Sequence, residues 1–216
     1  MAGFRKEFVA FCFEQDVLRF GQFTTKSGRT TPYFFDAGLF NNGAALDRLA
    51  QFYAKAILDS GVRFDMLFGP AYKGIVLATS TAIALSREGR NVPFAFNRKE
   101  AKDHGEGGDL IGAPLAGRVL IVDDVLTAGT AVGESIELIA QHGAVPCGVV
   151  ISLDRMERGP GKLSAIQEIE QRNGIPVIAI ASLDDLMLWL GDRTELRQNL
   201  NAIGEYRQIY GISRDA

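Results

Sequence analysis

Two adjacent acidic residues, followed by small and hydroxyl-bearing residues, are the clearest chemical signal in this 216-residue sequence. The segment VLIVDDVLTAGTA runs from an apolar stretch through Asp123 and Asp124 to Thr127, Gly129 and Thr130. Small residues let backbone N–H groups approach an anion, hydroxyl groups donate hydrogen bonds, and the start of a following helix adds a favourable partial charge. The segment therefore predicts a phosphate cradle at the end of a strand.

The two carboxylates suit a sugar phosphate better than a bare phosphate, which they would repel. Carboxylates accept hydrogen bonds from sugar hydroxyls and steady a developing cation. Taken as isolated residues, Asp123 and Asp124 fit a turn equally well, with Thr127 or Thr130 as a helix N-cap. The unbroken order of the segment favours the sugar-phosphate interpretation. The sequence contains neither G-x-G-x-x-G nor G-x-x-x-x-G-K-[ST], so dinucleotide and P-loop sites lose their main support.

Alternating apolar and helical patterns indicate the elements that position this segment. We expect short strands, in chain order, at Met66–Gly69, Val92–Phe96, Arg118–Asp124, Val145–Leu153 and Ile175–Leu183. Helical spacing predicts a helix marked by Leu46–Ile57 that ends at Gly61, others at 74–89, around Val132–Ile139 and at 164–174, and a closing helix over Leu196–Tyr210. A polar, glycine-rich stretch follows at Asn97–Gly117, and its first part, Asn97–Gly108, is expected to be a mobile loop.

Strands and helices that alternate at this interval favour an α/β fold, with a mainly parallel sheet and helices on both faces. We expect one domain over residues 1–216. Its residues 1–40 supply an amphipathic helix at about Arg5–Leu18 and a β-hairpin, Phe20–Thr24 with Thr31–Asp36. This helix and hairpin lie outside the alternation and are expected to form a small cap, here called the hood.

The composition argues against nucleic-acid-binding, membrane-spanning and secreted proteins. Hydrophobic residues make up 47% and charged residues 23%, and the net charge of −3 gives no basic footprint for nucleic acid. No apolar run reaches the length of a membrane span, and the start lacks a signal peptide's apolar core. Cys12 and Cys147 are expected to be buried free thiols. We therefore expect a cytoplasmic protein without a zinc site.

Two further segments are rich in groups that attract anions. GPAYKG, residues 69–74, offers backbone amides in a turn after a strand, with Tyr72 and Lys73 at its lip. Alone, it would be an ordinary βα turn with a solvated lysine. NRKEAKDHGEGG, residues 97–108, gathers cations and glycines that could close over a polyanion and exclude water, although charged loops are usually just solvated. Its candidate residues are Arg98, Lys99, Lys102 and His104.

Two other segments fit an acidic, flat ligand. In TTKSGRTTPYFFDAG, residues 24–38, Lys26 supplies a cation and Phe34-Phe35 supply aromatic faces. The alternative is an ordinary strand pair, with one ring in and one out. In SLDRMERG, residues 152–159, the planar guanidinium of Arg155 suits a carboxylate. The alternative is a surface salt bridge to Glu157 or Asp154.

The segment at 119–131 resembles the phosphoribosyl pyrophosphate signature of type I phosphoribosyltransferases, and the other four resemble segments of orotate phosphoribosyltransferases. Together they cover about Phe20–Gly159. Thr30-Thr31 departs from the pattern, which has a basic residue and a serine there, and is expected to touch none of the candidate residues. The resemblance implies catalytic roles for Lys102, His104, Asp123 and Asp124. It implies substrate binding by Lys26, Phe34, Phe35, Tyr72, Lys73, Arg98, Lys99, Thr127, Ala128, Gly129, Thr130, Ala131 and Arg155.

The implied reaction moves ribosyl 5-phosphate from phosphoribosyl pyrophosphate to orotate, giving orotidine 5′-phosphate and pyrophosphate in pyrimidine (UMP) synthesis. The resemblance also implies Mg²⁺ between the ribose hydroxyls and pyrophosphate, without assigned protein ligands, and a homodimer whose loop at 97–108 reaches the neighbouring site. A purine-base phosphoribosyltransferase would share residues 119–131. A non-catalytic nucleotide sensor or RNA binder would need a basic face and a degraded loop. A generic nucleotide-binding scaffold of this fold would leave the other four segments unexplained.

Overall fold

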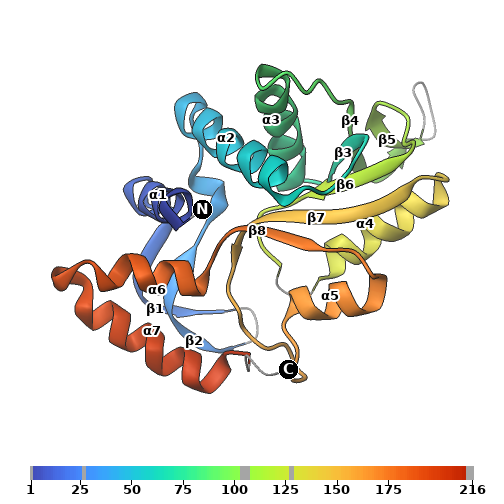
Figure 1. Ribbon diagram of the computed structural model, residues 1–216. Coiled ribbons are helices and arrows are strands. Elements are labelled where there is room, and N and C mark those ends of the chain that lie inside the picture. The colour runs from blue at the N-terminus through green and yellow to red at the C-terminus, as the bar shows by residue number, and fades with distance from the viewer. Residues whose placement is uncertain (1, 26–27, 103–107, 127–128, 213–216) are drawn as a thin grey trace.

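A six-stranded sheet forms the centre of the computed structural model, which describes residues 2–25, 28–102, 108–126 and 129–212, except the side chains of 2 and 100–102. The strand order is β5-β4-β3-β6-β7-β8 (Figure 1). The strands are β3 (Met66–Gly69), β4 (Phe94–Lys102), β5 (Gly108–Gly112), β6 (Arg118–Val122), β7 (Val145–Asp154) and β8 (Val177–Ser182). Only β5 pairs antiparallel, at one edge of this sheet. The predicted α/β class is confirmed.

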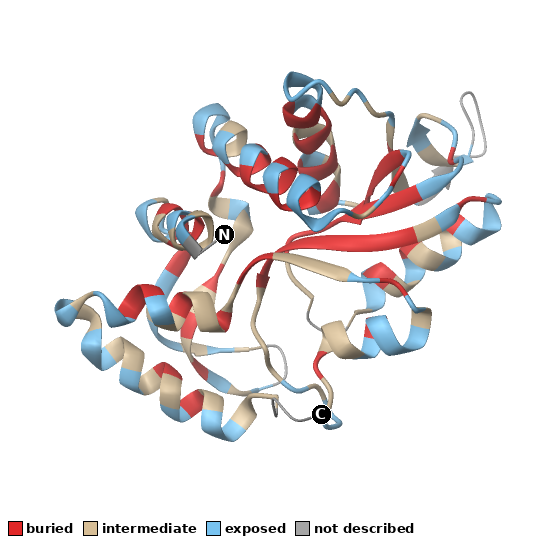
Figure 2. Cartoon of the chain, viewed as in Figure 1, coloured by how far each residue is buried: buried red, intermediate tan, exposed pale blue. Residues whose placement is uncertain are grey.

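Helices cover both faces of the sheet (Figure 1). Alternate strand residues face opposite sides, and Leu67 and Leu120 accordingly belong to one buried cluster, while Met66 and Ile121 belong to the other. The central strands are buried on both faces (Figure 2), as parallel strands between helices are. The first cluster includes residues of α2 (Gly43–Ser60) and α3 (Lys73–Arg87), and the second includes residues of α4 (Thr130–Gln141) and α5 (Ala165–Asn173).

The N-terminal helix and hairpin are present beside this sheet. They comprise α1 (Ala2–Glu14), β1 (Leu18–Thr24) and β2 (Thr30–Phe35), and the two strands form a separate antiparallel pair. The predicted helix boundary at Leu18 is wrong, because Leu18 already pairs with Phe35 across the hairpin. Short 3-10 helices lie at Ala37–Leu39 and Thr194–Leu196.

Two helices near the end of the described chain pack beside the hairpin (Figure 1). The closing helix is α7 (Arg197–Tyr210), as expected, and α7 contacts β2. The preceding helix, α6 (Leu183–Gly191), was not predicted. Its signal is a reciprocal capping box between Ser182 and Asp185. The apolar run that ends β8 continues into this helix, and the apolar periodicity alone does not separate the two.

The described part of Asn97–Gly108, expected to be a loop, belongs to a second β-ribbon. Strand β4 begins at Phe94 rather than Val92 and continues through Asn97 to Lys102, and β5 pairs with it antiparallel. Backbone hydrogen bonds form this ribbon, and charged side chains are common on strands near a sheet edge. The polar composition therefore gave no indication that β4 continues to Lys102. Residues 103–107 lie outside the described part of the chain.

Both cysteines, Cys12 and Cys147, are buried and free, as predicted. Among the described residues, no helix combines the length and apolar character needed to cross a membrane.

Candidate active site

The turns after β3 and β6 meet at the point where the strand order reverses. From β3 the chain passes outward to β4, and it then returns to form β6 on the opposite side of β3. Ligands of open α/β sheets bind at such a switch point, beyond the carboxyl ends of the strands. The turn after β3 carries GPAYKG, and the turn after β6 carries Asp123 and Asp124.

Two glycines allow these turns to approach each other. A Cβ on Gly69 would collide with the carbonyl oxygen of Gly74. A Cβ on Gly74 would lie 2.5 Å from the Cδ of Pro70 and 3.0 Å from the carbonyl oxygen of Val122. The turn is also tied to β4, because the N–H of Ala71 donates to Oδ1 of Asn97 at 2.8 Å. Only residues without side chains fit at this crossing.

Lys73 and Asp124 connect the two turns directly. The ammonium of Lys73, at the start of α3, donates to Oδ2 of Asp124 at 2.6 Å and lies 4.0 Å from Oδ1 of Asp36, which follows β2. Partial burial lowers the pKa of Lys73, but the hydrogen bond and charge of Asp124, with smaller effects of Asp36 and Asp123, raise it overall. Lys73 is half exposed, so this cation remains available to a ligand at the switch point.

Asp123 and Asp124 are both buried, with 9% and 8% of their surfaces exposed. Burial, together with the negative charge of Asp124, raises the pKa of Asp123 to about 7. Its backbone is fixed from α2, where the buried hydroxyl of Tyr53 donates to the carbonyl oxygen of Asp123 at 2.8 Å. That hydroxyl also shares a 2.6 Å hydrogen bond with Ser152 of β7. Asp123 is therefore held by two neighbouring elements.

The predicted phosphate cradle coincides with the start of α4. Gly129 is the N-cap residue with a φ of +69°, and Thr130 and Ala131 open the helix. A residue with a side chain would be strained at this φ. Because glycine has no side chain to cap the first turn, the N–H groups there remain available to an anion. Thr127 and Ala128 lie outside the described residues.

Cationic residues of β4 lie beside the GPAYKG turn. Lys99 places its Nζ 5.1 Å from the ring centre of Tyr72, whose side chain is 69% exposed at the lip of the turn. Arg98 is half-buried, and its Nε has no hydrogen-bond partner among the described residues. Lys102 ends the strand, where its backbone pairs with Gly108. The side chain of Lys102 and all of His104 lie outside what the structure describes.

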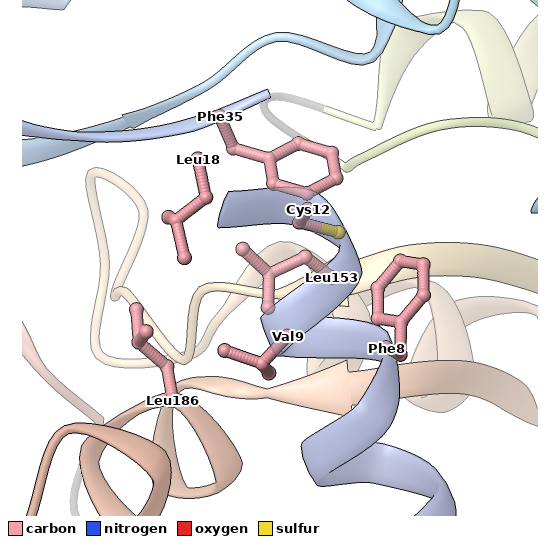
Figure 3. Close-up of a pocket in the computed structure, with 7 residues that line it drawn as sticks. All are labelled: Phe8, Val9, Cys12, Leu18, Phe35, Leu153 and Leu186. Carbon is pink, nitrogen blue, oxygen red and sulfur yellow. The ribbon is translucent and has the colours of Figure 1, made fainter. Parts of the chain in front are cut away.

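The two hood phenylalanines point to opposite faces of β2. Phe35 is buried in the core, and Figure 3 shows its ring near Cys12, Leu18 and Leu153 beside a small apolar cavity. Phe34 is half-buried on the other face, where it stacks with Phe23 at a centroid distance of 5.4 Å. The two rings therefore cannot cover one ligand together, and only Phe34 keeps the predicted role. Lys26 lies outside the described residues.

Arg155 follows β7 directly, but its guanidinium already has partners. Nη2 lies 2.6 Å from Oε1 of Glu157, and Nε donates to the same oxygen at 2.9 Å. Nη2 also donates to Oγ1 of Thr31 at 3.1 Å, and the ring of Tyr33 lies beneath at 4.2 Å. The expectation that Thr31 touches no candidate residue is thus wrong. The salt bridge to Glu157 exists, but it is mostly buried rather than on the surface.

Several site residues were not found from the sequence. Tyr53 counted there only as an apolar helix position, and its hydroxyl left no pattern. Ser152 is a polar residue inside an otherwise apolar strand, a signal that could have been used. Asp36 and Glu157 lie within recognised segments but were given no role at the site. Tyr53, Ser152 and Asp36 contact the site through the tertiary fold, whereas Glu157 pairs with Arg155 two positions away.

Comparison with known proteins assigns the chain to a broad class, the phosphoribosyltransferases, before it gives a particular family. The family model described as "Phosphoribosyl transferase domain" matches residues 38–178, which include both turns at the switch point. An orotate phosphoribosyltransferase of Laribacter hongkongensis is 63% identical over 98% of this chain and 100% of its own length, and one of Neisseria meningitidis serogroup C is 61% identical over the same shares.

A solved structure agrees with the sequence relatives. The crystal structure of an orotate phosphoribosyltransferase from Francisella tularensis superimposes with a TM-score of 0.87 at 41% identity, covering 95% of this chain and 99% of that one. The chain belongs to the orotate phosphoribosyltransferase family.

Proposed function

We propose that this protein transfers the ribosyl 5-phosphate group of phosphoribosyl pyrophosphate to N1 of orotate, releasing pyrophosphate and forming orotidine 5′-phosphate. The observation that carries the proposal is the meeting of Lys73 with Asp124 at the switch point, directly before the uncapped start of α4. This arrangement offers acceptors for ribose hydroxyls between an anion site and a cation. The family membership supports the same reaction.

Asp123 and Asp124 hold the ribose while the first turn of α4 binds its 5-phosphate. Each carboxylate has one oxygen engaged by a backbone N–H group, of Asp124 and Val125 respectively. These bonds fix the rotamers of both side chains, so the ribose hydroxyls meet acceptors that are already oriented. As the bond from C1 to pyrophosphate breaks, positive charge develops on the ribose, and the ionised carboxylates stabilise it.

Cations around GPAYKG neutralise the departing pyrophosphate. Lys73 exchanges its bond to Asp124 for the leaving group, and Tyr72 offers a backbone N–H, because Pro70 has none and that of Ala71 donates to Asn97. Arg98 and Lys99 approach from β4, and the predicted cations Lys102 and His104 would add to this charge. Negative charge that is met by cations in a site shielded from water costs less to develop, so departure is faster.

Orotate lies between the ribose and the hood. Phe34 presents an aromatic face, Lys26 supplies a second cation, and Arg155 receives the carboxylate. Orotate is already an anion, and the site needs to orient N1 toward C1 rather than to supply a strong base.

Magnesium fits this site as an ion that arrives with its polyphosphate. Among the described residues no group of three or more His, Cys, Asp or Glu side chains could hold a metal ion. Mg²⁺ often keeps several waters and binds mainly through substrate phosphates, so such a cage is not required. When bound, it would neutralise negative charge on the pyrophosphate. We assign no protein ligand to it.

We also propose a homodimer with shared active sites. Tyr72, Val76 and Ile83 are exposed apolar residues along α3, at 69%, 49% and 50% of their surfaces. Their spacing places them on one side of the helix, and exposed apolar stripes mark protein interfaces. The stripe begins at the lip of the site, so a partner bound there would lie close to the cations of β4.

We also propose that the protein works in the cytoplasm. Its buried free cysteines suit a reducing cytoplasm.

The direct test follows the ultraviolet absorbance of orotate in the presence of phosphoribosyl pyrophosphate and Mg²⁺. Orotate should be consumed, whereas adenine, hypoxanthine and xanthine should not react. Arg155→Ala should chiefly raise the KM for orotate and leave the KM for phosphoribosyl pyrophosphate nearly unchanged. No absorbance change with the wild-type protein would overturn the proposed function, and intact orotate binding in the variant would overturn the role of Arg155.

The shared site has its own test. Lys102→Ala should lower kcat by about 10²-fold, the scale of losing one electrostatic stabiliser. Mixing Lys102→Ala subunits with Asp124→Asn subunits should restore activity, because one site of each mixed dimer then holds both native residues. Near-normal turnover of the first variant would remove Lys102 from the mechanism. Mixtures without recovered activity would show that the sites are not shared.

A further inference from the structure

The loop after β7 is fixed by the end of α7, far away in sequence. The N–H of Arg158 donates to the carbonyl oxygen of Tyr210 at 2.9 Å, and the N–H of Ile212 donates to the carbonyl oxygen of Met156 at 3.0 Å. Glu157 and Gly211 form an antiparallel β-bridge between these bonds. Residues 156–158 therefore pair with residues 210–212 as two short strands would, although they lie outside both sheets.

The backbone of this loop is strained at the residue next to Arg155. Met156 has a φ of +52°, a left-handed conformation that residues with side chains rarely adopt. Oδ1 of Asp154 accepts a hydrogen bond from its N–H at 2.8 Å, and Ile212 binds its carbonyl oxygen. Such conformations persist where surrounding contacts enforce them, and they concentrate at functional sites. The turn at Met156 brings Glu157 back against Arg155.

The hairpin joins the same assembly from the other side. Arg29 donates from Nη1 to the carbonyl oxygen of Arg158 at 2.9 Å, and its guanidinium lies 5.0 Å from the ring centre of Tyr210. Thr31 and Tyr33 contact Arg155 itself, and Thr31 is 1% exposed. Arg155 is thus enclosed by residues of β2 and by Glu157, which the end of α7 supports.

We propose that Glu157 is a positioning residue for orotate recognition, which holds the guanidinium of Arg155 by its Nε and Nη2 nitrogens in the orientation that meets the orotate carboxylate. Gly211 and Ile212 act one step further out, by fixing the loop that carries Glu157. This inference rests on the proposed function. It adds that the selectivity for an acidic base depends on a carboxylate that does not touch the substrate.

The test compares Glu157→Gln with Glu205→Gln, which removes the same charge from an exposed position on α7. Glu157→Gln should raise the KM for orotate about ten- to hundredfold, the scale of weakening a charge-assisted hydrogen bond, while the KM for phosphoribosyl pyrophosphate stays within about twofold. Glu205→Gln should change neither constant. A merely structural role would instead lower thermal stability and move both constants together, and that result would overturn the proposal.

The contribution of the α7 end is tested by two shortened chains. A chain that stops after Tyr210 loses Gly211 and Ile212, and its KM for orotate should rise at least several-fold with little change for phosphoribosyl pyrophosphate. A chain that stops after Ile212 keeps the bond to Met156 and should behave as wild type. Equal constants for the two chains would overturn this step. If the wild-type protein fails to consume orotate, the proposed function fails; if it turns over normally and Glu157→Gln is silent, only this inference fails.

Discussion

The ends of β6 and β7 each carry a cluster of oppositely charged side chains, but the two clusters are built differently. At β6, Asp123 and Asp124 are adjacent in sequence, and α3, which follows the neighbouring strand, supplies Lys73. At β7, Arg155 depends on Glu157, on Thr31 of the hairpin, and on the loop held by Ile212. The sugar-phosphate side is thus made by the central sheet, whereas the base side is assembled from peripheral elements.

This difference separates the common part of the reaction from its specific part. A sheet switch point fixes the geometry of ribose and phosphate with short connections, and such geometry suits any base. The peripheral contacts can change without disturbing the sheet, so they are the natural place for base selectivity. Variants on the two sides, together with a pH titration, test this division.

The largest effect is expected at Asp124. Asp124→Asn should lower kcat/KM for phosphoribosyl pyrophosphate by about 10²–10³-fold, because it removes a charge that steadies the ribose and the partner of Lys73. Steady-state kinetics with each substrate varied in turn would measure it. Asp36→Asn is the control, since its carboxylate lies 4.0 Å from Lys73, and it should lose less than about threefold. Similar losses for both variants would contradict the division.

The adjacent phenylalanines should separate stability from binding. Phe35→Ala should lower the free energy of unfolding by about 3–5 kcal/mol, because it empties a buried core position. Phe34→Ala should cost much less stability and instead raise the KM for orotate. Chemical denaturation and kinetics of the two variants would show this. Equal destabilisation, or unchanged orotate binding in Phe34→Ala, would contradict the assigned faces.

Asp123 should make the sugar-phosphate side dependent on pH. Because its folded pKa of about 7 lies above the ordinary value of 3.8, the folded state binds the extra proton, and stability should fall as pH rises from about 4 to about 7. Conversely, binding of phosphoribosyl pyrophosphate should strengthen as pH rises through about 7, because the ionised carboxylate is the better acceptor. Calorimetric titrations should show the trend, and Asp123→Asn should abolish it. The same slope in that variant would assign it to another group.

The smallest effect is expected at Thr31. Thr31→Ser keeps the hydroxyl that accepts from Arg155 and should change the KM for orotate by less than about twofold. Thr31→Val removes the hydroxyl at similar size and should raise that KM by about three- to tenfold, the scale of one buried hydrogen bond. A silent Thr31→Val would show that Glu157 alone sets the position of Arg155.

The same division explains what the sequence could predict. The strand before Asp123, the turn at Gly69–Lys73 and the start of α4 follow from local patterns, and the sheet order then brings them together. Among the partners of Arg155, Glu157 lies two positions away and was considered from the sequence, but Thr31 lies 124 positions away and does not follow from such patterns. Likewise, apolar alternation in the hairpin was read correctly as strands, but which ring of Phe34-Phe35 faces the core required the packing of α1 and α6. The polar ribbon at β4 and β5 was missed since backbone pairing leaves no side-chain signature.

The backbone hydrogen bond from Ile212 to Met156 also bears on the order in which parts of the protein fold during synthesis. Strands β3 and β6, with Lys73 and Asp124, are complete once little more than half the chain has been made, whereas the enclosure of Arg155 awaits residues that follow α7. A nascent chain on the ribosome would thus gain the capacity to hold a ribose phosphate before it could select the base to attach.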